Sequence, residues 1–232
     1  PANFQLQTTA CRGVQSGSAH SLAIVNETLF YKSKTSICAY DGSLPVEIST
    51  SLGNTRFDQA TAGALGNKYY VSMRDIDAET HRMFVYDTAR GMWHKEDDTH
   101  SLGFCNHQGN LYYIDYDYNE IRTVHAEDDL YETVVKWQAI TGIIGTDRPD
   151  KKYISRLLVR LSMAFGARVT FYIEYDSCGA WEQLFTTSGT SMRSFSIPIR
   201  PKRCDHMRLR IDGVGEAKIL SICKTLEQGS DM

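Results

Sequence analysis

RVTFYIEYD, residues 168–176, is the stretch that decides the fold class, because its apolar and polar side chains alternate one by one. Successive side chains of a β-strand point to opposite faces, so a period of two is typical of a strand with one buried face. The side chains that this pattern places in a core are Val169, Phe171, Ile173 and Tyr175, and those it places outside are Thr170, Tyr172 and Glu174.

The same period recurs on both sides of this stretch. It predicts further strands in SRLLVRLSM (155–163), SFSIPIR (194–200), MRLRI (207–211) and EAKILSICKT (216–225). Their predicted inward residues are Leu157, Val159, Leu161, Met163, Phe195, Ile197, Ile199, Met207, Leu209 and Ile211. Glycine-containing turns separate the strands, including DGVGE (212–216), and Pro198 favours an edge position for its strand. Residues 131–232 are therefore predicted to form an antiparallel β-sandwich or jelly roll.

The first half carries a repeat instead. Three stretches each join a turn signal to an aromatic pair: NETLFYKS (26–33), GNKYYVSM (66–73) and GNLYYIDY (109–116). A Tyr-Asp pair and a glycine turn follow the first two, whereas the third copy is more degenerate. Repeats of about 40 residues made of short strands are typical of β-propeller blades.

Residues 1–130 are therefore predicted to form a propeller-like domain with blade-like units at about 18–50, 57–98 and 99–128. Three units are fewer than the roughly four to eight blades of a closed propeller. Either sequence outside this chain completes the ring, or the units form an open array. A plain meander of hairpins is the alternative to the repeat. The predicted fold class is all-β, with propeller-like repeats followed by a sandwich.

The two halves differ in charge. Residues 1–135 have a net charge of −8 and residues 136–232 one of +5, although the whole chain has only −3. Such a polar molecule can stack head to tail with its own copies or bind a charged partner. The alternative is that two domains have drifted to different charges.

The cysteines give no framework of disulfides. They are scattered, without a C-x-x-C pair, at Cys11, Cys38, Cys105, Cys178, Cys204 and Cys223. We expect reduced thiols, mostly buried as small apolar side chains. The first residues, PANFQLQTTACRG, lack the pattern of a secretory signal, and no apolar run is long enough for a membrane helix. We therefore expect neither signal-directed secretion nor membrane insertion.

Reactive residue types meet at Cys204, Asp205 and His206. If they lie in a strand, Cys204 and His206 point away from the core, and Asp205 points away from both. They then cannot converge on one atom, so no catalytic or metal site is predicted there. WHKEDDTH (93–100), followed by His107, holds His94, Glu96, Asp97, Asp98 and His100. It lacks a metal-binding motif and is interpreted as an acidic loop. No catalytic residue, cofactor, metal or specific nucleic-acid site is predicted.

One basic feature rises above this background. Arg156 and Arg160 share the outward face of one predicted strand, as Arg208 and Arg210 do of another. If the two strands are neighbours, the four arginines form a stripe that can contact a partner through carboxylates. The alternative is a solvated face with scattered charge.

Parts of the chain resemble structural proteins of tailed bacteriophages and prophages. These parts are AYDGSLPVEIS (39–49), GNKYYVS (66–72), FVYDTARGMWHKED (84–97), TDRPDKKYISRL (146–157) and RSFSIPIRPKRCDHMRLRI (193–211). The resemblance is to tail, stabilisation, nozzle or hub proteins that join propeller-like and sandwich modules. It implies an assembly role without an active site, partners among other virion proteins or further copies, and synthesis in the bacterial cytoplasm before incorporation in a virion.

The leading hypothesis is thus a non-enzymatic assembly module of a tail or head–tail region. The runner-up is a carbohydrate- or receptor-binding module that recognises a glycan or host receptor. In that case, aromatic residues such as Tyr116, Tyr118 and Trp181 would stack on sugars. A third hypothesis, an enzyme that uses the region between His94 and His107, has the least support.

Overall fold

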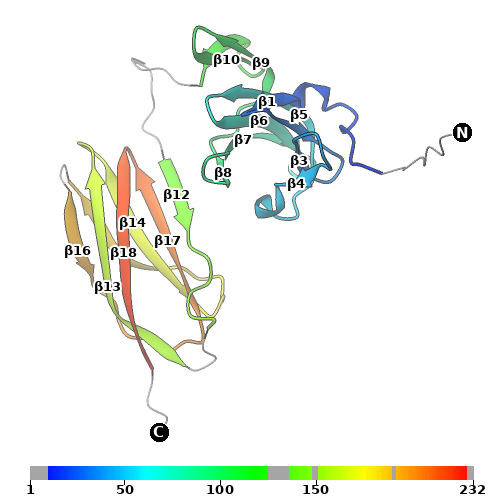
Figure 1. Cartoon of the computed structure of the whole chain (residues 1–232). Coiled ribbons are helices and arrows are strands. Elements are labelled where there is room, and N and C mark those ends of the chain that lie inside the picture. The colour runs from blue at the N-terminus through cyan, green and yellow to red at the C-terminus, as the bar shows by residue number, and fades with distance from the viewer. Residues whose placement is uncertain (1–9, 125–135, 148–150, 190–191, 229–232) are drawn as a thin grey trace, which may run out of the picture. The chain divides into compact units, whose positions relative to one another are not determined.

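The computed structural model of the chain describes residues 10–124, 136–147, 151–189 and 192–228. Strands dominate these residues, which contain only two short 3-10 helices, η1 (Ala19–Ser21) and η2 (Thr50–Leu52). The predicted all-β fold class is confirmed. The chain divides into two compact units, Pro1–Asp128 and Asp129–Met232, which are coloured blue to green and green to red in Figure 1. The division predicted from the sequence lies between residues 130 and 131.

The first unit consists of three antiparallel sheets that follow one another along the chain. The first is formed by β1 (Ala23–Val25), β2 (Thr28–Lys32), β3 (Ile37–Tyr40) and β4 (Val46–Glu47). The second is formed by β5 (Phe57–Leu65), β6 (Lys68–Asp75), β7 (Thr80–Asp87) and β8 (Met92–Lys95). The third is formed by β9 (Ser101–His107), β10 (Asn110–Asp115) and β11 (Glu120–Thr123). Each sheet is a meander whose strands pair in chain order, as in a propeller blade.

The middle sheet is buried on both faces. Tyr69 packs with Phe30 and Ile37 against the first sheet, whereas its neighbour Tyr70 packs with Leu111 against the third. A strand buried on both faces has no polar side to alternate with, which explains the consecutive residues Tyr69, Tyr70 and Val71 in β6. Between β5 and β9 the backbones approach closely, since a Cβ atom on Gly63 would lie 2.6 Å from the Cβ atom of Phe104.

Three hairpins of this unit share one turn. An aspartate ends the first strand, and its Oδ1 accepts the backbone N–H groups of the second and third residues after it. The fourth residue after it is left-handed, with φ between 53° and 62°. The buried aspartates are Asp75, Asp87 and Asp115, and the left-handed residues are Glu79, Gly91 and Asn119. The predicted Tyr-Asp recurrence in FVYDTARGMW is one instance of this turn.

The second unit is a sandwich of two antiparallel sheets. One sheet has the order β12-β17-β14-β15 and the other the order β16-β13-β18. The strands are β12 (Lys136–Ile140), β13 (Lys152–Met163), β14 (Arg168–Tyr175), β15 (Glu182–Ser188), β16 (Arg193–Ile197), β17 (Met207–Val214) and β18 (Ala217–Gln228). β16, which precedes Pro198, lies at a sheet edge as predicted. β18 forms the opposite edge, and among the described residues nothing pairs with its outer side.

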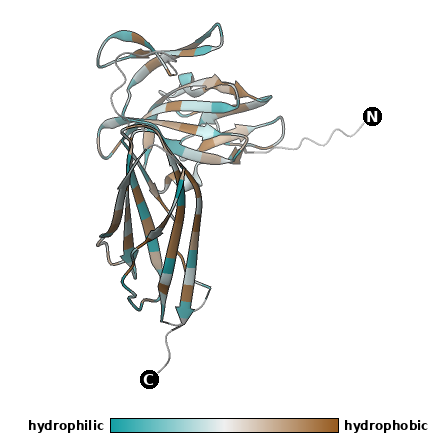
Figure 2. Ribbon diagram, turned by 90° about the vertical axis from the view of Figure 1, so that its left-hand side faces the viewer, coloured by the Kyte–Doolittle hydropathy of each residue, from teal (hydrophilic) through white to brown (hydrophobic). Residues whose placement is uncertain are grey.

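The core of the sandwich follows the predicted alternation. The inward residues of β13, β14 and β17 are at most 6% exposed, and Ile197 of β16 is 2% exposed. Phe195 and Ile199 are partly buried against this core. Figure 2 shows the resulting succession of hydrophobic and hydrophilic residues along the long strands. One residue departs from the pattern, because Glu174 faces outward yet is only 1% exposed.

Two local predictions are wrong. Gly213 does not belong to a turn but lies within β17, where a Cβ atom would come within 1.9 Å of the Trp137 ring. The reversal follows at Gly215, whose φ is 79° and whose carbonyl oxygen accepts the Trp137 indole N–H at 2.9 Å. The thiols are also not mostly buried. All six are free, but only Cys38 and Cys204 are buried.

Candidate functional site

The four predicted arginines do not form one stripe. Arg156 and Arg160 lie on β13 in one sheet of the sandwich, whereas Arg208 and Arg210 lie on β17 in the other sheet. Because outward residues of the two sheets of a sandwich point in opposite directions, the two pairs are on opposite faces. The prediction depended on neighbouring strands, and this condition is not met.

Arg208 is committed to a partner within its own unit. Its Nε donates to Glu174 Oε2 at 2.6 Å, and its Nη2 also contacts this oxygen. The other Glu174 oxygen accepts the Gly179 N–H at 2.8 Å. Burial alone would raise the pKa of Glu174, but these hydrogen bonds outweigh it and hold the pKa below its usual value. The pair therefore stabilises the end of the β14–β15 hairpin.

Arg210 lies between two aromatic rings. Its guanidinium carbon is 4.2 Å from the centre of the Tyr172 ring and 5.1 Å from that of Trp181. Its Nη2 pairs with Asp212 at 3.3 Å, whereas its buried Nε has no hydrogen-bond partner among the described residues. Cation–π contacts of this kind hold an arginine in place on a sheet surface.

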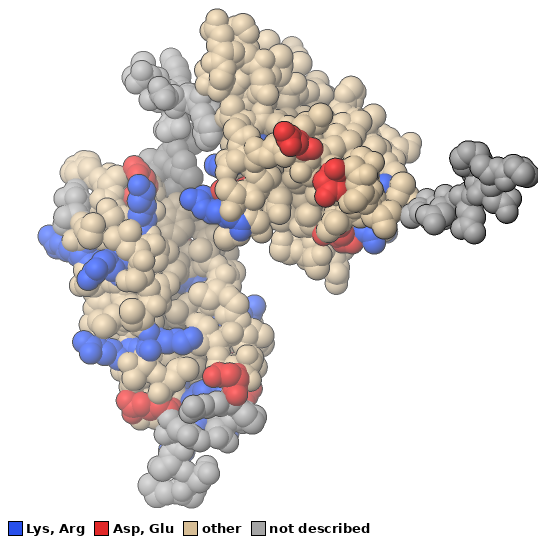
Figure 3. Space-filling model, in the orientation of Figure 1, with Lys and Arg blue, Asp and Glu red and all other residues tan. Residues whose placement is uncertain are grey.

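The outward side of the β16-β13-β18 sheet is different in character, and we call it the basic sheet face. Strand register places Arg156 opposite Thr225, and Arg160 opposite both Ser221 and Ser194. The residues that the register places on this face are Arg156, Leu158, Arg160, Ser162, Ser194, Ser196, Lys218, Ser221, Cys223 and Thr225, with Tyr153 and Glu227 at one end. Glu227 is the single carboxylate of these three strands, and it accepts the Tyr153 hydroxyl at 2.7 Å. Figure 3 shows Lys and Arg side chains over the middle of the sandwich unit and Asp and Glu side chains toward its ends.

The cations of this face have no ionic partner within the described part of the chain. Arg156, Arg160 and Lys218 are exposed and form no ion pair with described residues. Arg160 makes one neutral contact, from Nε to Ser194 Oγ at 3.1 Å. Of the predicted contact residues, the pair on β13 thus remains available to a partner.

The triplet Cys204, Asp205 and His206 is not in a strand, since β17 begins at Met207. Cys204 forms an isolated bridge with Lys152 and is only 1% exposed, so its predicted outward orientation is wrong. Asp205 does not point away from His206 either. Its Oδ2 is 3.0 Å from His206 Nδ1, and this hydrogen bond lowers the pKa of Asp205.

A serine completes this cluster. Ser177 Oγ is 2.7 Å from His206 Nε2, which gives the contact order of a nucleophile, a base and an orienting acid. An acyl-transfer site also needs N–H donors for the developing oxyanion. Nearby N–H groups are occupied, because those of Asp205 and His206 donate to Asp176 Oδ1 and that of Cys178 to a carbonyl oxygen. The cluster fastens the β14–β15 turn to the loop before β17.

The histidine side chains of residues 93–107 have different partners and do not form one cluster. His94 contacts Glu96 at 3.0 Å, whereas His100 stacks on His81 with ring centres 3.4 Å apart. No group of three potential metal-binding side chains is found among the residues that the structure describes. Burial first, and then the neighbouring His100 and Arg74, lower the pKa of His81 to about 4. This stack between the second and third sheets has no signal in the local sequence.

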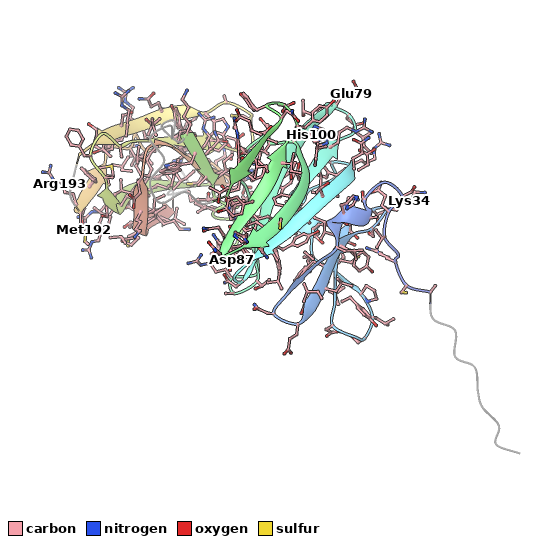
Figure 4. All side chains as sticks on the ribbon, turned by 90° about the horizontal axis from the view of Figure 1, so that it is seen from above. Lys34, Glu79, Asp87, His100, Met192 and Arg193 are labelled. Carbon is pink, nitrogen blue, oxygen red and sulfur yellow. The ribbon has the colours of Figure 1, made fainter. Side chains whose placement is uncertain are left out.

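A cleft in the first unit also went unpredicted. It has a volume of about 480 Å³ and lies between the ends of β2 and β3 and the segment that leads through η2 into β5. Lys32, Lys34, Asn54 and Phe57 are among its lining residues. Figure 4 shows Lys34, Glu79 and His100 toward one side of this unit and Asp87 at the opposite end. A lysine directly after the buried pair Phe30–Tyr31 was the available sequence signal.

The aromatic residues proposed for sugar stacking are divided between the two units. Tyr116 and Tyr118 lie in the β10–β11 turn of the first unit and are 58% and 65% exposed, whereas Trp181 lies in the second unit. Tyr116 packs beside His100, and Arg122 covers the Tyr118 ring. Tyr118 and Trp181 therefore belong to different units.

Comparison with known proteins leaves the function open. No family model and no curated protein matches the chain. Among solved structures, an exo-β-1,3-galactanase from Phanerochaete chrysosporium with galactose is similar at 8% identity and a TM-score of 0.28, over 83% of this chain and 65% of that one. A structure described as a glycoside hydrolase is similar at 10% identity and a TM-score of 0.28, over 85% and 69%. The chain thus spans about 65% of the galactanase. Structural similarity at this level of identity and TM-score does not assign the activity of these proteins to this chain.

No helix within the described ranges is long and apolar enough to cross a membrane.

Proposed function

We propose that this chain is a non-enzymatic assembly protein of the tail or head–tail region of a bacteriophage, and that its basic sheet face binds an acidic protein surface. The observation that carries the proposal is the free charge of Arg156, Arg160 and Lys218 on a face whose strands carry a single carboxylate, Glu227, which is bound by the Tyr153 hydroxyl. The resemblance to virion proteins in residues 39–49, 66–72, 84–97, 146–157 and 193–211 supports the assembly role.

Arginine suits such a contact, because its planar fork can bind a carboxylate through two parallel hydrogen bonds. One exposed ion pair contributes only about 0–1 kcal/mol, so binding requires several pairs in a partly dried interface. The opposite charge of residues 1–135, at −8, makes another copy of this chain a suitable partner.

The test compares wild-type protein with the double variant R156E/R160E by sedimentation velocity, alone and with other virion proteins, at low and high salt. The matched control is K136E/R168E, which changes the charge equally at exposed positions of the other sheet. We expect R156E/R160E and high salt to weaken assembly and the control to retain it. Equal assembly of all three proteins under both conditions would contradict the proposal.

A second candidate is glycan binding by the opposite face of the sandwich. The stack of Tyr172, Arg210 and Trp181 favours it, because aromatic rings beside polar side chains suit sugar rings. The test is a glycan array with wild-type protein, Trp181→Ala and R156E/R160E. Glycan binding that requires Trp181 but not Arg156 would favour this candidate over assembly.

A further inference from the structure

Lys32 is a buried cation that forms no ion pair with any described residue. It is only 3% exposed, although it carries an ammonium group at the end of β2. Its Nζ donates to Gln15 Oε1 at 3.0 Å and to the Ser33 carbonyl oxygen at 2.5 Å. Both acceptors are neutral, and an ammonium group has three N–H donors. Taking a charge out of water is costly unless an opposite charge compensates it.

This ammonium group borders the cleft of about 480 Å³, which falls within the usual range of small-molecule sites. The other two cations of the lining, Arg56 and Lys34, differ in whether they form an ion pair. Arg56 pairs with Asp77 at 2.8 Å, whereas Lys34 is exposed and forms no ion pair with described residues. The one carboxylate of the lining, Glu47, is already paired with Arg12. The cleft therefore has excess positive charge within a half of the chain that is strongly acidic overall.

The uncharged residues of the lining indicate which other groups a ligand of this cleft would carry. Asn54 and Thr55 offer exposed groups that both donate and accept hydrogen bonds. Phe57 and Met73, which are 6% and 0% exposed, form an apolar part of the lining. A ligand complementary to this lining would have hydroxyl groups for Asn54 and Thr55, an apolar ring face for Phe57 and Met73, and a carboxylate for the lysines. A sugar acid combines these three features.

We propose that the cleft between the first and second sheets binds a sugar acid, with the carboxylate at Lys32 and Lys34 and the hydroxyl groups at Asn54 and Thr55. Desolvation lowers the pKa of Lys32 and the nearby Asp58 offsets this only in part, so a bound carboxylate would further favour the charged ammonium form. This site lies in the first unit and is independent of the basic sheet face.

The experiment titrates wild-type protein with D-glucuronate by two-dimensional NMR, with D-glucose as the neutral sugar and inorganic phosphate as the bare anion. We expect shifts of residues around the cleft with glucuronate and much weaker binding of glucose and phosphate. K32M and K34M should each weaken glucuronate binding about tenfold, the loss typical of one charge-assisted hydrogen bond. The matched control K68M removes a lysine of the same unit that does not line the cleft.

The outcomes are distinct. Glucose that binds as well as glucuronate would overturn the role of the carboxylate, and phosphate that binds as well would overturn the assignment to a sugar. Because Lys34 is exposed, K34M keeps the test valid even if K32M alters folding. R156E/R160E should bind glucuronate like the wild type, so a failure of the cleft proposal is distinguishable from a failure of the assembly proposal.

Discussion

At Gly213 the chain accommodates an aromatic ring where any side chain would collide with it. We predict that Gly213→Ala destabilises the sandwich by about 1–3 kcal/mol, the usual cost of overpacking, because the Trp137 ring must move from the strand. Chemical denaturation followed by fluorescence measures the change. Gly142→Ala is the matched control, since a Cβ atom there meets nothing within 4 Å. Equal stability of both variants would contradict the prediction.

Phe171 is the largest apolar side chain that the alternation of residues 168–176 places inside the sandwich, and it is 1% exposed. Its truncation to alanine leaves a cavity, so Phe171→Ala is expected to lower the free energy of unfolding by about 3–5 kcal/mol. Urea denaturation tests this, with the outward Thr170→Ala as control. A loss below about 1 kcal/mol would show that the two faces of β14 are inverted.

His81 gives the first unit a dependence on pH. Its pKa in the folded state, about 4, lies below the ordinary value near 6.5, so the unfolded chain binds more protons between these values. Stability should therefore fall as the pH decreases from about 6.5 to about 4. His81→Phe keeps a ring beside His100 but cannot titrate. Thermal unfolding across this range should show a smaller pH dependence for the variant than for the wild type, and identical slopes would argue against this assignment.

The orientation of single residues could be predicted from the sequence, but their burial could be predicted only in part. The inward positions of β13, β14 and β17 could be predicted, because alternation is a local property. The burial of Cys204 could not, since it results from a bridge to Lys152, far away in the sequence. The same applies to Glu174, which alternation correctly turned outward but whose burial comes from Arg208 and the hairpin turn.

Among the elements, the aspartate turn sets the ends of three hairpins. Asp75 is 4% exposed, and its carboxylate accepts the N–H groups of Asp77 and Ala78 and pairs with Arg82. We predict that Asp75→Ala destabilises the first unit by about 1–3 kcal/mol, because buried donors lose their acceptor. The exposed Asp77→Ala retains its backbone N–H and should cost no more than about 1 kcal/mol. Comparable losses in thermal unfolding of the two variants would rule out this role of Asp75.

The repeat was visible in the sequence but not its register. The two residues between the strands are Gly66 and Asn67 in the second copy but Gln108 and Gly109 in the third. The Gly-Asn pairs of the two copies therefore do not occupy the same positions in their hairpins. Counted from the turn, the tyrosine pair of the third copy lies one position later in β10 than the pair of the second copy does in β6. A shift of one residue exchanges the faces of a strand. The aligned buried positions are thus Tyr69 and Leu111 rather than the tyrosine pairs.

For the whole molecule, the separate cores lead to a prediction about cooperativity. The first unit has its own apolar clusters around Tyr69 and Tyr70, and the sandwich has another around Phe171. Differential scanning calorimetry should therefore resolve two transitions. Asp75→Ala should move only one of them and Phe171→Ala only the other. A single transition that both substitutions shift equally would show that the units unfold together.

The candidate sites depend on which strands and segments lie next to one another, and no single stretch of the sequence shows this. The two arginine pairs were each placed correctly on an outward face, but which strands are neighbours is set by non-local pairing. The basic sheet face gains Lys218 and loses Arg208 and Arg210 for this reason. The cleft at Lys32 likewise combines segments from two sheets, so its residues have no common motif.

The outer side of β18 has a consequence for the handling of the protein. Twelve residues of strand, one side of which pairs with no described residue, form a template on which an extended chain can add, which is how ordered aggregates start. Lys218, Lys224 and Glu227 interrupt this strand with charge and act as gatekeepers against such growth. Colloidal stability of the purified chain should thus depend on a few charges at one edge, and acetylation of its lysines would remove much of that protection.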